Sequence, residues 1–353
     1  MADTTRIEWT QSTFNPWVGC VKVSEGCAHC YAEVSTPARR SRAQELPLWG
    51  PDAARRMTSA DYWKQPYQWD RQAAKAGEQR RVFCASLADV FEGYGGQMIG
   101  KDGLPLWWRV GGDSLCQCAE RPGPDWEPYT MAEARAELFG VIEQTPNLTW
   151  QLLTKRPENM TRYAPAHWGH GWPANVWAGT SVENQRRADE RIPHLLRVPA
   201  SVRFLSAEPL LGPISLRGLR PGCYCAGYCE SCDPPGCDGD CGGVSPGVQW
   251  VIVGGESGHQ ARHCNLDWVR HIVRQCQRAG VACFVKQMGG NPTEGRAYEG
   301  ISEAHLIYQD AKGGDPDEWP ADLRVRQFPG DAPPPAQPTL FPGQDEGPYH
   351  DRI

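Results

Sequence analysis

Three cysteines early in the chain have a spacing that can hold a metal. Cys20, Cys27 and Cys30 form the pattern C-x6-C-x2-C. Three thiolates can hold three corners of a [4Fe–4S] cluster; because such clusters normally take four cysteines, the fourth iron would stay open to an outside ligand. The amine and carboxylate of S-adenosylmethionine (SAM) can fill that position. Zinc sites use the same C-x2-C spacing, so this stretch alone leaves zinc and iron–sulfur open.

A second set of candidate residues lies at the ends of six short apolar runs, at 81–92, 148–157, 175–184, 202–214, 248–258 and 281–290. The residues there that could bind a cofactor or take part in catalysis are Ser86, Asp89, Lys155, Arg156, Ser181, Glu183, Glu208, Gly254, Gly255, Glu256, Ser257 and Lys286. The lysines and Arg156 could hold carboxylate or phosphate groups, and Glu183 and Glu208 could bind ribose hydroxyls or donate protons. For any single residue, a salt bridge at the rim of a sheet, such as Lys155 with Glu183, is the alternative.

The elements that must position these residues follow from the pattern of the runs. Each run holds four to six apolar residues between turn residues, which is typical of a strand buried on both faces. Helical stretches at 131–144, 183–196 and 266–280 alternate with the runs, which predicts parallel βαβ units. With one more strand before the cysteines, the sequence predicts an α/β fold, a partial or complete (β/α) barrel. Functional residues gather at the carboxyl ends of the strands in such barrels.

Two insertions interrupt this alternation, at about 93–128 and 220–245. The first contains Cys116 and Cys118. The second contains six cysteines within 19 residues: Cys223, Cys225, Cys229, Cys232, Cys237 and Cys241. Because the second has almost no apolar residue, we expect a metal or disulfides to hold it. Four thiolates around zinc are the commonest solution, an auxiliary iron–sulfur cluster is the alternative, and Cys116 and Cys118 could complete a second site.

The remaining composition sets limits on partners and location. Residues 329–353 are Pro-rich and polar and predict a disordered tail, which leaves 1–328 as one barrel domain with its insertions. The net charge of −6 means that any nucleic-acid site must be a local basic groove. Arg and Trp residues in 39–71 could line such a groove, although a solvated helix pair covering the barrel is favoured.

The sequence also predicts a location in the cytoplasm. It has no run of about 18 apolar residues that would span a membrane, and its polar first residues lack the apolar core of a signal peptide. In that compartment, fifteen cysteines indicate metal ligands more readily than disulfides.

Several long motifs carry a family resemblance: IEWT, NPWVGC, GCAHCYAE, LLTKRP, NVWAGTSVEN, RFLSAEPLLGPI and WVIVGGESG. Over about Ile7 to Gly290 the chain resembles a phage-encoded, radical-SAM-like family of unknown function; the two cysteine-rich insertions fall outside that pattern. The resemblance implies a radical-SAM-type partial barrel with a [4Fe–4S] cluster on the three cysteines, SAM at the open iron, an external electron donor and a host cytoplasm. Residues 254–257 resemble the Gly-rich SAM-contacting strand end of such proteins, where glycines let backbone approach a ligand.

These features favour a radical SAM enzyme that modifies or repairs a nucleic acid or nucleotide, after SAM is cleaved to methionine and a 5′-deoxyadenosyl radical. A radical SAM enzyme on a small molecule or peptide is the nearest alternative. A non-catalytic zinc or iron–sulfur scaffold associated with phage DNA is another. A fourth ligand such as His263 or Cys264 would favour the scaffold, since closed four-ligand sites are structural. A Mg²⁺ nuclease using Asp89, Glu183, Glu208 and Glu256 is weaker, since it leaves the cysteines unexplained.

Overall fold

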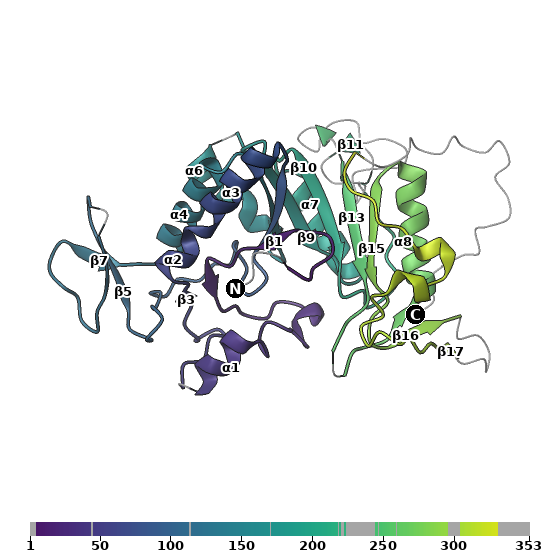
Figure 1. Cartoon of the computed structure of the whole chain (residues 1–353), viewed down its shortest axis with the longest axis horizontal. Coiled ribbons are helices and arrows are strands. Elements are labelled where there is room, and N and C mark those ends of the chain that lie inside the picture. The colour runs from purple at the N-terminus through teal and green to yellow at the C-terminus, as the bar shows by residue number, and fades with distance from the viewer. Residues whose placement is uncertain are drawn as a thin grey trace.

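The centre of the molecule is a curled half-barrel of seven parallel strands (Figure 1). The computed structural model describes residues 5–43, 45–112, 114–169, 171–217, 219, 222–223, 244–245, 247–258, 260–295 and 304–330. The strands, in their order across the sheet, are β1 (Ser12–Thr13), β4 (Arg80–Cys84), β8 (Leu148–Thr154), β9 (Val176–Ser181), β10 (Val202–Ala207), β13 (Trp250–Gly254) and β15 (Ala282–Gln287). The predicted α/β fold is confirmed, including the strand before the cysteines and the six apolar runs.

Strand register brings the carboxyl ends of the strands to one edge. The last pairs along neighbouring strands are Cys84 with Leu152, Thr154 with Thr180, Ser181 with Ser206, and Ala207 with Val253. Because all these pairings are parallel, whatever follows each strand emerges on the same side of the sheet.

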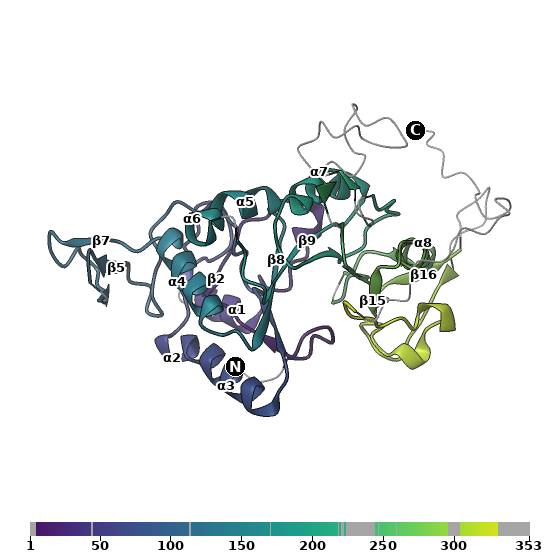
Figure 2. The same cartoon turned by 90° about the horizontal axis from the view of Figure 1, so that it is seen from above.

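Helices cover the outer face of the sheet (Figure 2). The predicted helical stretches are α4 (Met131–Glu143), α7 (Gln185–Leu196) and α8 (Leu266–Ala279). The first begins with a capping box of Thr130 and Glu133, and the last ends at Gly280 in the left-handed conformation. The shorter helices are α1 (Thr36–Ala43), α2 (Ala60–Trp63), α3 (Gln65–Ala76), α5 (Met160–Tyr163) and α6 (Pro165–Trp168).

Aromatic side chains fill the concave interior of the half-barrel. Phe83, Phe204, Trp250 and Phe284 point inward from four strands and form one buried cluster with Trp9. Their sequence neighbours on the same strands belong to a separate cluster under the helices, as the alternation of a strand requires. A Cβ at position 179, on β9, would collide with the Phe204 ring, so glycine there lets the two strands pack.

The first insertion forms a small antiparallel sheet of its own, in the order β6 (Leu115–Gln117), β5 (Leu106–Arg109), β7 (Trp126–Pro128). Both views show it projecting from the body of the protein (Figures 1 and 2). Other short pairs are β2 (Trp17–Val18) with β3 (Arg56–Met57), β11 (Gly222–Cys223) with β12 (Val244–Ser245), and β14 (Cys264–Asn265) with β16 (Pro292–Glu294) and β17 (Ala304–His305).

The Arg- and Trp-rich stretch forms helices, as favoured, but it is not wholly solvated, because part of it lies in the core. Trp63 and Trp69 are buried in the main cluster, and Arg55 is 1% exposed. These three side chains cannot stack on bases or reach phosphates. The sequence after Cys30 also predicts a helical stretch from Tyr31 through Arg40. In the structure this helix starts at Thr36, because residues 31–34 form a turn.

Candidate functional site

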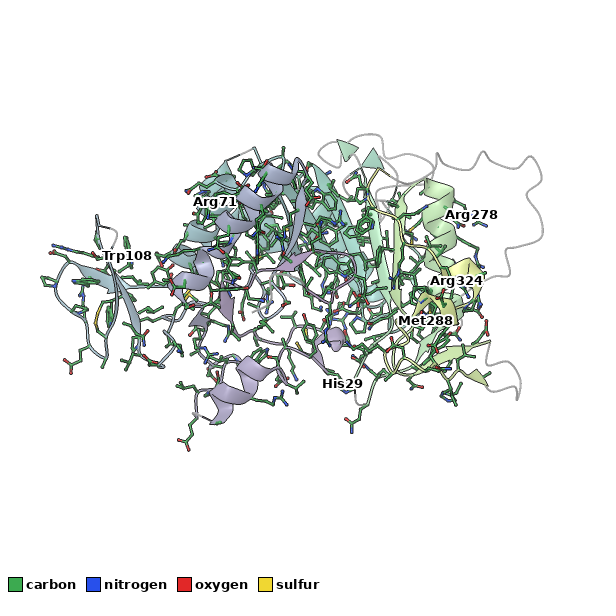
Figure 3. All side chains as sticks on the ribbon, in the orientation of Figure 1. His29, Arg71, Trp108, Arg278, Met288 and Arg324 are labelled. Carbon is green, nitrogen blue, oxygen red and sulfur yellow. A yellow bond between two sulfur atoms is a disulfide. The ribbon has the colours of Figure 1, made fainter. Side chains whose placement is uncertain are left out.

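Residues 19–30, which we call the cysteine loop, lie across the carboxyl ends of the parallel strands. The Gly19 amide donates to the Leu87 carbonyl, after β4, at 3.0 Å. Further along, the loop contacts side chains that follow β8, β9 and β13. His29 marks the loop in Figure 3. Three of the polar residues predicted at the strand ends, Arg156, Glu183 and Glu256, therefore contact this loop.

Asp89 joins the ends of β4 and β8. Its carboxylate accepts hydrogen bonds from Thr154 Oγ1 at 2.6 Å and Arg156 Nη1 at 2.8 Å. It also accepts from the amides of Phe91 at 3.0 Å and Lys155 at 3.1 Å. An ionised carboxylate offers about four acceptor positions, so these donors occupy it fully. In this structure Asp89 positions Arg156, rather than presenting a free carboxylate for catalysis.

Arg156 links the strand ends to the first cysteine. Its Nη2 donates to the Val21 carbonyl at 2.9 Å, and its Nη1 lies 3.8 Å from Cys20 Sγ. The Val21 amide donates to Glu92, whose carboxylate forms a buried, two-pronged ion pair with Arg55 at 2.7 and 2.8 Å. Burial raises the pKa of the Cys20 thiol to about 12, and nearby carboxylates act in the same direction. The metal-free thiol keeps its proton at neutral pH, and a metal would have to displace it.

Glu183 anchors the middle of the cysteine loop. It is fully buried, accepts from Ser24 Oγ at 2.5 Å and from Arg191 Nη1 at 2.7 Å, and lies 3.9 Å from Lys155 Nζ. A Cβ on Gly26 would collide with the Glu183 side chain. Glycine at position 26 therefore lets the loop settle onto this carboxylate.

Glu256 and Arg262 hold the end of the loop. Glu256 accepts from Arg262 Nη2 at 2.6 Å and Nε at 2.9 Å, and lies 3.1 Å from His29 Nδ1. The remaining Arg262 nitrogen, Nη1, donates to the Glu25 carbonyl at 2.8 Å. Burial alone would raise the pKa of Glu256, but the hydrogen bonds from Arg262 and His29 outweigh burial and lower it. His29 thus contacts a strand-end carboxylate from its place between two cysteines.

Two further candidates are paired near the same edge. Glu208 forms an ion pair with Lys286 at 2.5 Å, and both side chains are only partly buried. Ser86 donates its amide to Asn15 Oδ1 at 2.8 Å and exchanges side-chain hydrogen bonds with the same residue. Asn15 thereby holds the segment after β4 against the start of the chain.

The glycines at 254 and 255 pack on the neighbouring strand. The Gly255 amide donates to the Gln287 carbonyl at 3.0 Å, and a Cβ on Gly255 would collide with the Met288 carbonyl oxygen. Gly254 also lies against Gln287, whereas Ser257 is exposed. The close approach expected of these glycines is made to the backbone of residues 287–289, at and just after the end of β15, which accounts for them without a ligand.

The three loop cysteines are free thiols of intermediate exposure. Within the described part of the chain, no group of three or more His, Cys, Asp or Glu side chains is close enough to hold a metal ion. A cluster on this loop therefore requires its side chains to rearrange. Both proposed fourth ligands have other surroundings: Cys264 is buried in the main core, and the His263 ring packs at a tilt against Trp268, with ring centroids 5.1 Å apart.

The structure describes the cysteines of the first insertion and one cysteine of the second. Cys116 and Cys118 are joined to each other as a disulfide, in which state neither is a thiolate ligand. Cys223 lies on β11, which pairs with β12. The other cysteines of that insertion (Cys225, Cys229, Cys232, Cys237 and Cys241) lie outside the described residues.

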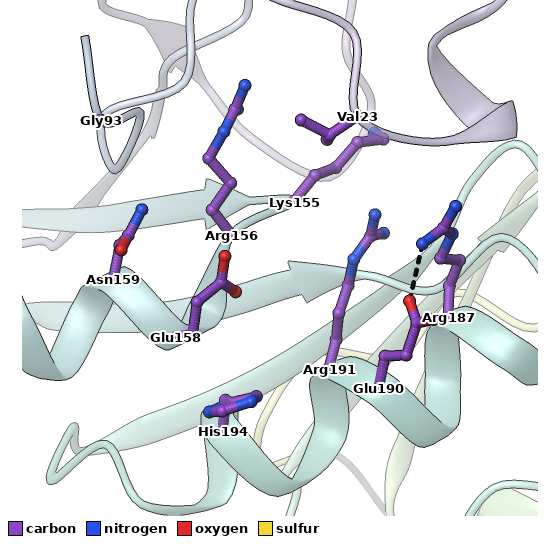
Figure 4. Close-up of a pocket in the computed structure, with 10 residues that line it drawn as sticks. All are labelled: Val23, Gly93, Lys155, Arg156, Glu158, Asn159, Arg187, Glu190, Arg191 and His194. Carbon is purple, nitrogen blue, oxygen red and sulfur yellow. Dashed lines mark hydrogen bonds and ion pairs between the residues drawn. The ribbon is translucent and has the colours of Figure 1, made fainter. Parts of the chain in front are cut away.

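A cavity of about 460 Å³ opens between the cysteine loop, the end of β8 and α7 (Figure 4). Its lining is Val23, Gly93, Lys155, Arg156, Glu158, Asn159, Arg187, Glu190, Arg191 and His194. Ser181 lies next to it, and its Oγ accepts from Lys155 Nζ at 3.1 Å. The cavity thus combines the strand ends with basic residues of α7.

The family model described as "Protein of unknown function (DUF5131)" matches residues 4–95 and 127–314. The chain belongs to this family. No curated protein and no solved structure matches the chain. The DUF5131 match contains the cysteine loop and every strand-end residue named above, and it omits 96–126, which includes β5 and β6. No helix in the described ranges is both long and apolar enough to cross a membrane.

Several residues that hold the site in this DUF5131 member were not given a catalytic or cofactor-binding role from the sequence. They are Arg55, Glu92, Arg187, Arg191 and Arg262. Arg262 follows the run 248–258 in the stretch GGESGHQAR, and Glu92 ends the run 81–92, so their positions offered a signal. Arg187 and Arg191 lie inside a helix, where nothing in the sequence separated them from surface arginines.

Proposed function

We propose that this protein is an iron–sulfur protein of radical SAM type. In this proposal Cys20, Cys27 and Cys30 hold a [4Fe–4S] cluster, and its open iron holds SAM. The observation that carries the proposal is that three free, partly exposed thiols share one loop, which lies over the polar carboxyl ends of a parallel half-barrel. The polar residues beneath the loop could bind and orient a cofactor and a substrate next to the cluster.

When bound and reduced, such a cluster supplies an electron to the sulfonium of SAM, with the electron coming from an external donor. The residues of this chain position the loop that would hold it. Ser24 and Gly26 seat the loop on Glu183, and Arg156 fixes its first cysteine through Val21. Lys286 and Glu208 form an ion pair at the same edge; in this proposal SAM or substrate contacts that pair. The substrate class we propose is a nucleic acid or nucleotide.

The Mg²⁺ nuclease is disfavoured by the pairing of its carboxylates. Each has a cationic partner: Asp89 with Arg156, Glu183 with Arg191, Glu208 with Lys286, and Glu256 with Arg262. A metal would have to displace these cations to bind the carboxylates. We therefore do not propose this function.

The test is anaerobic reconstitution with iron and sulfide, followed by electron paramagnetic resonance of the reduced protein with and without SAM. We expect a [4Fe–4S] signal that shifts on adding SAM and is lost in the Cys20→Ala/Cys27→Ala/Cys30→Ala variant. A Cys116→Ser/Cys118→Ser variant is the matched control and keeps the signal. Zinc alone at the three cysteines, without a response to SAM, would refute the proposal and favour a scaffold.

A further inference from the structure

The cavity beside the cysteine loop has the size and position of a substrate pocket. Its volume of about 460 Å³ lies within the range of about 300–1,000 Å³ that small-molecule sites occupy. Its walls come from four places in the chain: Val23 of the loop, Gly93 in the segment after β4, residues 155–159 after β8, and one face of α7. A ligand there would lie directly against the loop that carries the cysteines.

The charges in this cavity leave a positive excess at one end. Lys155 and Arg191 both flank the single buried carboxylate of Glu183, at 3.9 and 2.7 Å. Two cations share one anion, so the set of Lys155, Arg191 and Glu183 carries one net positive charge. The neighbouring Arg187 has the opposite balance, because two carboxylates, Glu25 and Glu190, engage it. Lys155 and Arg191 are 23% and 6% exposed, so solvent screens this excess only weakly.

Arg191 has donors left over for a ligand. Its Nη1 serves both the Ser181 carbonyl, at 2.8 Å, and Glu183. Its Nε and Nη2 have no hydrogen-bond partner within the described residues, and Figure 4 shows the guanidinium extending into the cavity. The His194 ring lines the same cavity, also without a side-chain partner in the described ranges. Arg187 differs, because Glu25 and Glu190 engage all of its nitrogens.

The opposite side of the cavity is lined by hydrogen-bond acceptors, whereas the side described above is lined by donors. Glu158 has no ion-pair partner in the part of the chain that the structure describes, and Asn159 uses its amide nitrogen on the Phe91 carbonyl at 2.8 Å. Both therefore present oxygen acceptors. Figure 4 shows them on the side away from Arg187. Acceptors suit the hydroxyls of a sugar or the amino group of a base, whereas cations suit a phosphate.

We propose that this cavity binds a phosphate group of a nucleotide unit, with Lys155 and Arg191 contacting the phosphate and Glu158 and Asn159 facing the nucleoside. His194, which Figure 4 shows below Glu158, lies on the nucleoside side. The inference deepens the proposed function and rests on it for the reaction, although not for the binding. Arginine provides a planar fork that matches phosphate oxygens, and lysine adds a point charge. The phosphate can belong to a free mononucleotide or to a nucleic-acid strand, and the test below distinguishes these two sources by their relative affinities.

The test measures ligand affinities by isothermal titration calorimetry on the full chain, both without iron and after reconstitution with iron and sulfide. The probes are adenosine 5′-monophosphate, adenosine, and a short single-stranded oligonucleotide. We expect the monophosphate to bind at least about tenfold more tightly than adenosine, because adenosine lacks the phosphate and cannot form the charge-assisted hydrogen bonds to it. Tighter binding of the oligonucleotide would assign the phosphate to a strand, and binding of the monophosphate alone would assign it to a free nucleotide.

Variants locate the binding. Lys155→Gln and His194→Gln should each weaken monophosphate binding, the former by about tenfold. Arg197→Gln, an exposed change just after α7, should leave it unchanged. Circular dichroism checks that each variant is folded, and His194→Gln keeps the test decisive if Lys155→Gln is not.

Two results would overturn the inference: equal affinity for the monophosphate and adenosine, or competitive displacement of the monophosphate by SAM, which would assign the cations to the SAM carboxylate. Nucleotide binding without any cluster would refute the proposed function alone. A SAM-responsive cluster without nucleotide binding would refute this inference alone.

Discussion

Adding one methyl group at Gly26 should loosen the cysteine loop measurably. In Gly26→Ala, the new Cβ would overlap the Glu183 side chain. That carboxylate cannot easily move, because it is fully buried and held by Arg191 and Ser24. Overpacking of this kind costs about 1–3 kcal/mol. We expect the free energy of unfolding, measured by urea titration, to fall by that amount.

Two further variants isolate the collision from other effects of the substitution. Gly212→Ala, where a Cβ meets nothing within 4 Å, is the matched control and should change stability by about 0.5 kcal/mol or less. In a Glu183→Ala background the obstacle is gone, so Gly26→Ala should then cost almost nothing. If Gly26→Ala costs the same with and without Glu183, or nothing in the natural chain, the contact does not position the loop and our reasoning is wrong.

Two other predictions concern charges around the site. Glu92→Gln should lower the free energy of unfolding, measured by urea titration, by about 3–5 kcal/mol, because it leaves the Arg55 guanidinium buried with a weaker partner. The control is Glu127→Gln, which breaks the exposed pair with Arg121 and should cost about 0–1 kcal/mol. Equal losses in the two variants would contradict the prediction. Glu256 has a lowered pKa in the folded protein, so its contribution to stability is present above its ordinary value of 4.5 and is lost as pH falls through the folded value. Urea titrations at a series of pH values should therefore show Glu256→Gln less stable than the natural chain near neutral pH and converging with it in acid; a constant difference would refute the assigned hydrogen bonds.

The sequence predicted the strands and helices well because each is encoded locally. Runs such as 148–157 and 248–258 hold enough consecutive apolar residues to specify a buried strand, and Thr130 with Glu133 marks a helix start. The alternation of these elements then determined the parallel half-barrel. The helix expected at Tyr31 failed at its boundary, where the residues after Cys30 form a turn.

The site was less predictable because its contacts join distant parts of the chain. Ser24 and Glu183 are 159 positions apart, and nothing local to either residue indicates the hydrogen bond between them. The same holds for the Arg262 side chain and the Glu25 carbonyl, which are 237 positions apart. Sequence reasoning could place Glu183 at a strand end, but only the packed structure shows that it is buried beneath the loop.

The aromatic interior of the half-barrel has a consequence for how the chain folds during synthesis. Trp9, from the first described segment, lies 6.1 Å from Trp250, and Phe328, from the last, lies 5.5 Å from the same ring. Phe284 on the final strand also contacts Phe328 at 5.4 Å. The earliest and latest parts of the barrel thus belong to one cluster. Trp9 can pack on Phe83, at 4.8 Å, early in synthesis, but the cluster is complete only after residue 328 has emerged from the ribosome. Because such distant contacts form late, folding of this barrel should be slow and should finish only after translation has passed its last strand.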